Sequence, residues 1–327
     1  MGKGSGFGKV ILFNEHFVVY GIPAIASAID SKTEAVIERV YDPSSLVPSG
    51  EEGSMRGPGW VLEDNRPANP GYKIEKFDHQ RESINLVLGA ANFETERNNI
   101  RITLGGNLKA VGGVGASAAV CVSIARALND EFDLGFDDER INQIAYEGER
   151  AYAGTPSGID NTASTYGGLL EFERNLSGGE NRIELVRVKE PIRIVMGNTG
   201  VTANTKAAVE GVRDRRERMP GEYGKIFDKS RALVASAQSA LGEYDLRTLG
   251  SLMDENHRLL QQIEVSHPRL DDLVSISREA GAWGAKMTGG GLGGYMVALT
   301  PDAEIQDSVA GAIEERGYEA LKTSIGI

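Results

Sequence analysis

Short apolar runs dominate the first forty residues of the chain. Val10 to Phe13 and Ala24 to Ile29 are two such runs, and a turn signal at Gly21–Pro23 separates them. Thr33 to Val40 follows with apolar side chains at spaced positions. Runs of this length, bounded by glycine and proline, are typical of β-strands. The chain is therefore predicted to begin with three strands.

Residues 41–72 lack any such pattern. They are rich in glycine, proline, serine and acidic residues, with only scattered apolar positions, which predicts a long loop or a decorated insertion. Helical periodicity begins at Phe77 and continues to Phe93, and Asn99 to Leu104 is a predicted strand.

The remainder of the chain alternates helix and strand patterns and becomes mainly helical after Val201. Asp137 and Asp138 are suited to cap the helix that begins at Glu139. The predicted helices are Val120–Asn129, Glu139–Ala153, Thr205–Glu217, Tyr223–Leu241, Asp245–Ile263, Leu270–Ala280 and Asp302–Arg316. The predicted strands are Ser164–Phe172, Ile192–Gly197, Tyr295–Leu299 and Ala320–Ile325. This mixture predicts an α/β (α+β) fold with two domains, residues 1–185 and 186–327.

Composition narrows the class of protein. The chain has 327 residues, 40% of them hydrophobic and 25% charged, which is enough for a buried core in one or two domains. Its net charge of −12 disfavours binding to nucleic acid or to an anionic membrane. A single cysteine, Cys121, favours a reducing compartment, and the four histidines lack the neighbours of a zinc site. Without a leader-like start or an apolar run of about 18 residues, the chain is expected in the cytoplasm.

Three glycine-rich segments are candidates for binding phosphate: Gly6–Lys9, Gly112–Ala119 and Gly289–Gly294. Glycine lets the backbone approach an anion closely, and a helix that begins directly afterwards adds the positive end of its dipole. The second segment runs straight into a predicted helix. The P-loop pattern is absent, and two formal matches to the dinucleotide fingerprint lack the βαβ context of that fold. Each loop alone is equally consistent with a turn that needs positive φ.

Four polar residues near these loops fit the chemistry of phosphate transfer, but each also has a structural explanation. Glu149 lies about 80° round its predicted helix from Ile141, so it is either a solvated flank residue or a metal ligand at the edge of a cleft. Asp160 is either an Asx-turn residue or a carboxylate presented to a substrate hydroxyl. Lys9 borders an apolar run and needs a partner or solvent. His16 suits a structural hydrogen bond as well as a substrate contact.

Taken in order, these segments resemble the motifs of the GHMP kinase superfamily, and within it those of the mevalonate kinases. The segments similar to its three motifs are Gly8–Gly21, Gly113–Ala119 (the phosphate loop) and Lys286–Gly294. Further matches to mevalonate kinases are Gly148–Arg150, Pro156–Asn161 and Thr205–Arg213. The matches run in order from residue 8 to residue 294, so they cover nearly the whole chain.

The resemblance implies a fold, a reaction and a set of roles. Two α/β domains would enclose the active site in the cleft between them, and the enzyme would transfer the γ-phosphate of ATP to the 5-hydroxyl of mevalonate in isoprenoid biosynthesis. Asp160 would take or orient the hydroxyl proton, Lys9 would hold Asp160 ionised, and Ser117 and Glu149 would bind Mg²⁺. The residues expected to contact the ATP phosphates are Gly112, Gly113, Val114, Gly115, Ala116, Ser117 and Ala118. Those expected to contact the alcohol are Glu15, His16, Ser157, Thr205, Gly290 and Gly291. A homodimer is common in the family.

The sequence departs from the family pattern in five ways. Asn14 replaces the usual glycine, Phe17 replaces alanine, and Ala116 replaces the first serine of a pair. The proline that usually precedes the second motif is missing, and Leu292 interrupts the third glycine run. Because Asn14 and Phe17 lie near the expected substrate, these departures bear on which alcohol is used more than on the reaction type.

Several alternatives therefore stay open. One is another GHMP kinase, acting on phosphomevalonate, a sugar or the 3-hydroxyl of mevalonate, although Glu15–Gly21 favours mevalonate over a sugar. A second is a non-catalytic relative that binds ligand, and the presence of Lys9, Ser117, Glu149 and Asp160 argues against it. A third is a nicotinamide oxidoreductase, which the isolated glycine patterns support weakly.

Overall fold

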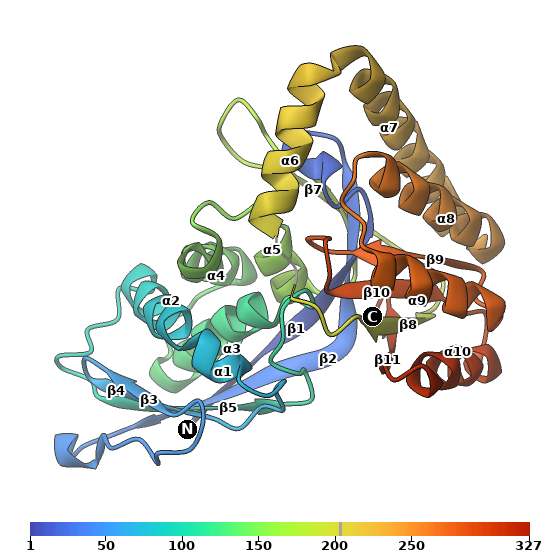
Figure 1. The fold of residues 1–327 in the computed structure, drawn as a ribbon. Helices are drawn as coiled ribbons and strands as arrows, with labels where there is room; N and C mark the ends of the chain where they lie inside the picture. The colour runs from blue at the N-terminus through green and yellow to red at the C-terminus, as the bar shows by residue number, and fades with distance from the viewer. Residues whose placement is uncertain (203–204) are drawn as a thin grey trace. The chain divides into compact units, whose positions relative to one another are not determined.

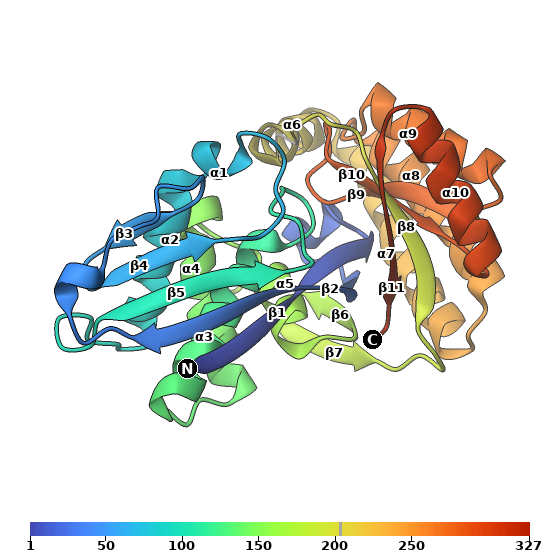
Figure 2. The same cartoon turned by 90° about the horizontal axis from the view of Figure 1, so that it is seen from below.

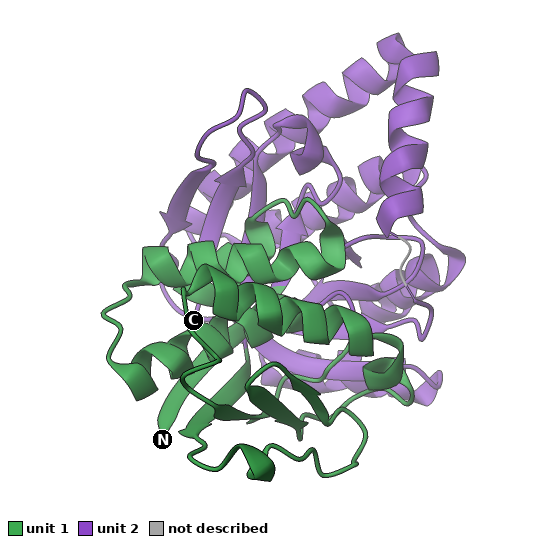
Figure 3. Cartoon of the chain, turned by 90° about the vertical axis from the view of Figure 1, so that its left-hand side faces the viewer, with its two compact units in different colours: residues 1–9, 31–111, 115–167 green, residues 10–30, 112–114, 168–327 purple. Residues whose placement is uncertain are grey.

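The computed structural model describes residues 1–202 and 205–327. They form two compact units, between which the chain passes several times (Figure 3). Unit 1 comprises Met1–Lys9, Ser31–Val111 and Gly115–Gly167, and unit 2 comprises Val10–Asp30, Gly112–Val114 and Gly168–Ile327.

Unit 1 is a sheet covered on one face by helices. The strand order is β3-β4-β5-β2, with β4 parallel to β5 and the other neighbours antiparallel, and β1 also pairs with β2. Figure 1 shows α2, α3 and α4 on one side of these strands. The strands of this unit are β3 (Met55–Gly57), β4 (Trp60–Asp64), β5 (Ile100–Gly106), and the parts of β1 (Gly2–Phe13) up to Lys9 and of β2 (Ala24–Arg39) from Ser31 onward. Its helices are η2 (Pro43–Ser45), α1 (Tyr72–Glu75), α2 (Phe77–Ala90), α3 (Ala116–Phe132), α4 (Asp138–Ala153) and α5 (Ile159–Tyr166).

The core of unit 1 explains why these segments fold together. Alternate residues of the strands, such as Ile37, Trp60 and Ile102, are fully buried against apolar faces of the helices, among them Val87 and Ile144. This is the pattern expected of strands with one face on a helix layer.

Unit 2 contains an antiparallel sheet in the order β11-β8-β10-β9, and β11 reaches the first half of β2 at the pair Ile29 and Ile325. Helices α8, α9 and α10 pack against these strands (Figure 2). The remaining strands are β6 (Leu169–Glu173), β7 (Arg182–Val186), β8 (Ile192–Asn198), β9 (Gly284–Thr288), β10 (Tyr295–Leu299) and β11 (Glu319–Ile325). The helices are η1 (Phe17–Tyr20), α6 (Thr205–Arg218), α7 (Pro220–Gly242), α8 (Leu246–Gln262), α9 (Pro268–Glu279) and α10 (Ala303–Glu315).

The mixed α/β class predicted from the sequence is confirmed, as are the predicted long helices of both halves. The Asp137 carboxylate caps α4 by accepting a hydrogen bond of 2.8 Å from the backbone N–H of Arg140. Among the described helices, none combines the length and the apolar character needed to cross a membrane.

Three predictions of local structure are wrong. Residues 41–72 are not one loop, because they contain β3 and β4, and Trp60 to Leu62 are fully buried. The predicted strand Ser164–Phe172 begins instead as the end of α5 and becomes strand only at Leu169. The strands at the start of the chain differ as well. The first predicted strand, Val10–Phe13, is only the end of β1, which begins at Gly2. The predicted strands Ala24–Ile29 and Thr33–Val40 are one strand, β2, which continues to Arg39.

Candidate active site

Four of the candidate residues come together in unit 1, and we call Lys9, Ser117, Glu149 and Asp160 the acid–lysine cluster. Lys9 lies on β1, Ser117 in the first turn of α3, Glu149 on α4 and Asp160 in the first turn of α5. The Lys9 Nζ atom lies 2.8 Å from Asp160 Oδ1. The lysine side chain is only 5% exposed whereas that of Asp160 is 35% exposed, so the carboxylate can be reached from solvent.

The position of Lys9 depends on a glycine in the neighbouring loop. Gly115 has φ +70° and immediately precedes α3. A Cβ atom at this position would lie 2.6 Å from Lys9 Cγ, which is closer than side chains approach one another. Gly115 therefore provides both the left-handed turn that starts α3 and the space that Lys9 occupies.

Glu149 is the most perturbed carboxylate of the cluster. It is buried, and burial raises its pKa to about 8, with a further increase from the negative charge of Asp160. The hydroxyl of Ser117 donates a hydrogen bond to the Glu149 carboxylate, but Glu149 Oε1 is buried and has no hydrogen-bond partner within the described residues. A buried carboxylate oxygen without a partner is costly, and a bound cation would remove that cost.

The glycine segment before Ser117 leads into a helix whose first backbone N–H groups can bind an anion. Helix α3 has 17 residues, no side-chain cap at Gly115, and its first backbone hydrogen bond runs from Ala119 N to Gly115 O at 2.9 Å. The N–H groups of Ala116, Ser117 and Ala118 consequently lack acceptors within the helix. They lie at its N-terminus, which is the positive end of the helix dipole. Gly113, with φ +100°, belongs to the same loop, as do Gly112 and Val114.

A second group of candidates meets in unit 2, and we call Glu15, His16, Thr205, Lys286 and Gly290 the histidine–glutamate cluster. His16 Nε2 lies 3.0 Å from the carbonyl oxygen of Gly290. Burial lowers the pKa of His16 to about 4, so the ring is neutral at pH 7. Because a carbonyl only accepts, Nε2 must carry the proton, which leaves the Nδ1 lone pair as an acceptor for a hydroxyl.

Thr205 is held directly against this glycine. A Cβ atom on Gly290 would lie 2.0 Å from Thr205 Oγ1, so the two residues touch only because Gly290 has no side chain. Gly291 has a different reason for being glycine: its φ is +70°, and a Cβ there would lie 2.3 Å from the carbonyl oxygen of Val265.

Lys286 is a site residue to which the sequence analysis gave no role. It lies on β9 with no exposed surface, and its ammonium donates to Glu15 Oε1 and to the carbonyl oxygen of Met287, the latter at 2.7 Å. Burial lowers the pKa of Lys286, and the Glu15 carboxylate opposes that effect. The signal in the sequence was a lone lysine between apolar residues of a strand, which demands a buried partner.

Ser157 lies in unit 1, just before α5. Its hydroxyl accepts a hydrogen bond of 3.3 Å from the backbone N–H of Ile159. It thus helps to fix the start of the helix whose first turn carries Asp160.

Two of the departures from the family pattern have structural explanations. Asn14 is buried with φ +70°, and its side-chain amide donates to the carbonyl oxygens of Pro23 (2.8 Å) and Ser230 (3.2 Å). Its Oδ1 accepts from Ser230 Oγ (2.7 Å) and Asn256 Nδ2 (3.3 Å). Phe17 is fully buried, with its ring centroid 5.1 Å from that of Phe227. Asn14 therefore binds the residues around His16 to α7 and α8, and Phe17 packs them against α7.

Sequence comparisons agree with this arrangement. The family profile described as GHMP kinases N terminal domain matches residues 85–168, and that described as GHMP kinases C terminal matches residues 237–319. The mevalonate kinase of Thermococcus sibiricus is 36% identical over 97% of this chain and 94% of its own length. That of Pyrococcus abyssi is 35% identical over 97% and 93%.

A solved structure has a similar fold along nearly the whole chain. The crystal structure of L. major mevalonate kinase in complex with R-mevalonate superimposes with a TM-score of 0.90 and 34% identity, covering 99% of this chain and 96% of the other. The chain belongs to the GHMP kinase family, with its two-domain fold. Within that family its relatives at this level of identity are mevalonate kinases.

Proposed function

We propose that this chain is an ATP-dependent mevalonate kinase, which transfers the γ-phosphate of ATP to the 5-hydroxyl of mevalonate in isoprenoid biosynthesis. The observation that carries the proposal is the Lys9–Asp160 ion pair of 2.8 Å beside the capless start of α3. The similarity to mevalonate kinases along nearly the whole chain supports the choice of alcohol.

Asp160 and Lys9 are the proposed catalytic residues. Asp160 accepts or orients the proton of the attacking hydroxyl, for which a partly exposed carboxylate on a rigid first helical turn is suitable. Lys9 pairs with that carboxylate at 2.8 Å and stabilises negative charge on the attacking oxygen. Phosphoryl transfer needs positioning and charge neutralisation more than covalent catalysis, so two such groups are sufficient.

ATP is the proposed phosphate donor, and its phosphates bind the segment from Gly112 to Ala118. The free N–H groups at the start of α3 supply the hydrogen bonds. On a chain of net charge −12, such local donors are needed to bring in a polyanion.

Mg²⁺ is the proposed metal, held by Ser117 and Glu149. Their oxygen atoms are the ligands that magnesium prefers, and the partnerless Glu149 Oε1 fits a cation. The described residues contain no cluster of three or more His, Cys, Asp or Glu side chains suited to a metal. Magnesium would retain water and substrate phosphates as further ligands and, when bound, would neutralise phosphate charge.

Contacts to mevalonate are assigned to Glu15, His16, Ser157, Thr205, Gly290 and Gly291. His16 presents a neutral ring whose Nδ1 accepts from a hydroxyl, and Thr205 adds a short hydroxyl side chain beside Gly290. Lys286 fixes the Glu15 carboxylate in one position, and so acts as a positioning residue.

We also propose the domain division 1–185 and 186–327, a cytoplasmic location and a homodimer. The two family profiles lie on either side of residue 185. The one cysteine, Cys121, is a buried free thiol, which suits a reducing compartment.

The test is an ADP-release assay with ATP and Mg²⁺ against mevalonate, phosphomevalonate, galactose and homoserine. The proposal expects turnover with mevalonate and none above background with the other three. Turnover with galactose or phosphomevalonate instead would show that the chain is another kind of GHMP kinase. ATP binding without turnover on any alcohol would support the ligand-binding relative.

A further inference from the structure

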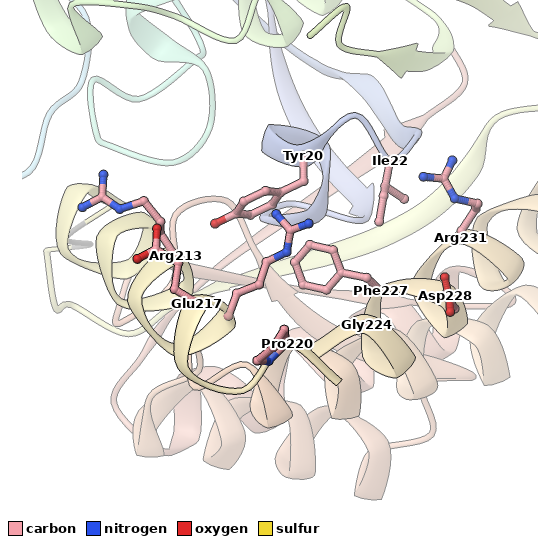
Figure 4. Close-up of a pocket in the computed structure, with 10 residues that line it drawn as sticks. Tyr20, Ile22, Arg213, Glu217, Pro220, Gly224, Phe227, Asp228 and Arg231 are labelled. Carbon is pink, nitrogen blue, oxygen red and sulfur yellow. The ribbon is translucent and has the colours of Figure 1, made fainter. Parts of the chain in front are cut away.

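A hollow of about 480 Å³ in unit 2 lies apart from both clusters (Figure 4). It is bordered by the 3₁₀ turn η1 and by helices α6 and α7. Its volume falls in the range of about 300–1,000 Å³ that small-molecule sites occupy. None of the residues assigned to ATP, magnesium or mevalonate borders it.

Arg216 is the charged group of the hollow that stacks on aromatic rings. Its guanidinium lies 4.7 Å from the ring centroid of Tyr20 and 5.0 Å from that of Phe227. Within the described residues it forms no ion pair with a carboxylate, so the N–H edges of the guanidinium remain for a ligand. Stacking on two rings fixes the side chain in advance, which reduces the entropy lost when it binds an anion.

Two further arginines border the same hollow. Figure 4 shows Arg213 and Arg231 on opposite sides, with the rings of Tyr20 and Phe227 between them. Arg213 has only a weak, exposed pairing with Asp214 at 3.6 Å, and Arg231 has no ion-pair partner within the described residues.

The acidic residues of the lining do not cancel these charges. Glu217 and Asp228 also border the hollow, and neither is ion-paired with an arginine in the described part of the chain. Three arginines against two carboxylates give a local charge of +1 on a chain whose net charge is −12. Guanidinium groups match the geometry of phosphate oxygens, and each can donate two parallel hydrogen bonds.

The base of the hollow is apolar. Ile22 and Phe227 border it although they are almost fully buried, and the more exposed Tyr20 ring and Pro220 complete the apolar part of the lining. The Tyr20 hydroxyl is a further donor, and burial raises the pKa of Tyr20, which keeps it protonated. A ligand that uses both features needs an anionic group and an apolar group.

We propose that this hollow binds a small phosphate monoester carrying an apolar or aromatic group, at a site separate from the nucleotide loop. The ligand contacts the turn that follows His16, because Tyr20 ends η1 and Phe17, at its start, packs on Phe227 at 5.1 Å. Occupancy of the hollow is therefore communicated to the histidine–glutamate cluster.

The experiment is a calorimetric titration of the full chain with phenyl phosphate, with ADP present at saturating concentration so that the nucleotide loop is filled. Arg216→Ala and Arg231→Ala should each weaken binding about tenfold, since a charge-assisted hydrogen bond contributes about that factor. Arg218→Ala is the matched control, because Arg218 is an exposed arginine of α6 that does not border the hollow. Phenol and inorganic phosphate, each lacking one half of the ligand, should bind at least tenfold more weakly than phenyl phosphate.

Several results would overturn the proposal. Equal affinity in wild type and Arg231→Ala would place the ligand elsewhere. Arg231 is exposed, and its side chain makes no hydrogen bond or ion pair with the residues that the structure describes, so its loss should not unfold the protein. Inorganic phosphate binding as tightly as phenyl phosphate would remove the apolar component. The His16 ring signal in a ¹H–¹³C NMR spectrum should shift on binding in wild type, and an unmoved signal would exclude the coupling to η1.

Discussion

The acid–lysine cluster of unit 1 and the Lys286–Glu15 pair of unit 2 both place a buried lysine against a carboxylate, yet they differ in completeness. Lys286 and Glu15 have side chains that are 0% and 1% exposed, and their charges balance. In unit 1, Lys9 faces two carboxylates, those of Glu149 and Asp160, and the Asp160 side chain is 35% exposed. A buried ion pair with balanced charges is costly to break, because one charge would be left buried alone. A carboxylate that solvent can reach is available to a ligand.

The largest expected effect comes from Asp160→Asn. Removing the proton acceptor should lower turnover by about 10²–10⁴ without unfolding the protein. Asp78→Asn is the matched control, because Asp78 is also an acidic residue in the first turn of a helix and forms no ion pair with any described residue. Steady-state rates and circular dichroism of both variants test this, and a folded Asp160→Asn enzyme with normal turnover would remove Asp160 from the mechanism.

Replacing each lysine in turn tests the contrast between the clusters. Lys286→Met leaves the Glu15 carboxylate buried without its cation, and should cost about 3–5 kcal/mol of unfolding free energy. Lys9→Met leaves no buried carboxylate without its cation in the same way, because Asp160 reaches solvent. It should therefore lower the free energy of unfolding by less than about 1 kcal/mol, while it abolishes most activity.

Urea denaturation of both lysine variants provides the measurement. The double variant Lys286→Met/Glu15→Gln should recover part of the lost stability, because it removes the buried charge. Equal losses for the two single variants would show that the two pairs are energetically alike, contrary to the distinction drawn from their burial.

Asn14→Gly tests whether the departure from the family pattern is structural. Glycine keeps the left-handed backbone but removes the side-chain bonds to Pro23, Ser230 and Asn256, so stability should fall by about 2 kcal/mol. Asn92→Gly is the control, since Asn92 is exposed with φ +53°. Thermal denaturation measures the loss, and a KM for mevalonate raised well beyond about twofold would instead give Asn14 a part in substrate selection.

The smallest effect is the change in the stability of metal-free protein that Glu149 causes between pH 6.5 and 8. Its pKa of about 8 exceeds the ordinary 4.5, so between these values the folded state holds more protons than the unfolded state. The contribution to stability is therefore full below pH 4.5 and is lost as pH rises toward 8, with a limiting slope of about 1.4 kcal/mol per pH unit.

Glu149→Gln should remove that slope, whereas Glu147→Gln on the same helix should retain it. The comparison belongs between pH 6.5 and 8, because His16 and His257, with pKa values lowered to about 4, add an opposite slope below 6.5. Glu149→Gln should also require more Mg²⁺ for half-maximal turnover. Identical magnesium titrations of the two variants would count against a metal role for Glu149.

The sequence predicted the long helices and the order of the motifs, because helical periodicity and glycine loops are local signals. It did not predict β3 and β4, since their apolar residues are few and their burial depends on pairing with β5, about forty residues further along the chain. A lone lysine in an apolar strand indicated that Lys286 needs a buried partner, but the sequence could not identify that partner, because Glu15 is 271 positions away. Interactions between distant segments require the fold to be known.

The most direct test of the central claim is the ³¹P NMR spectrum of the product formed from mevalonate and ATP. Transfer to the 5-hydroxyl places phosphate on a CH₂ group, so the account predicts a phosphomonoester signal split into a triplet by the two C5 protons. A singlet would mean phosphorylation of the tertiary 3-hydroxyl, and the absence of any ester signal would mean that mevalonate is not the substrate.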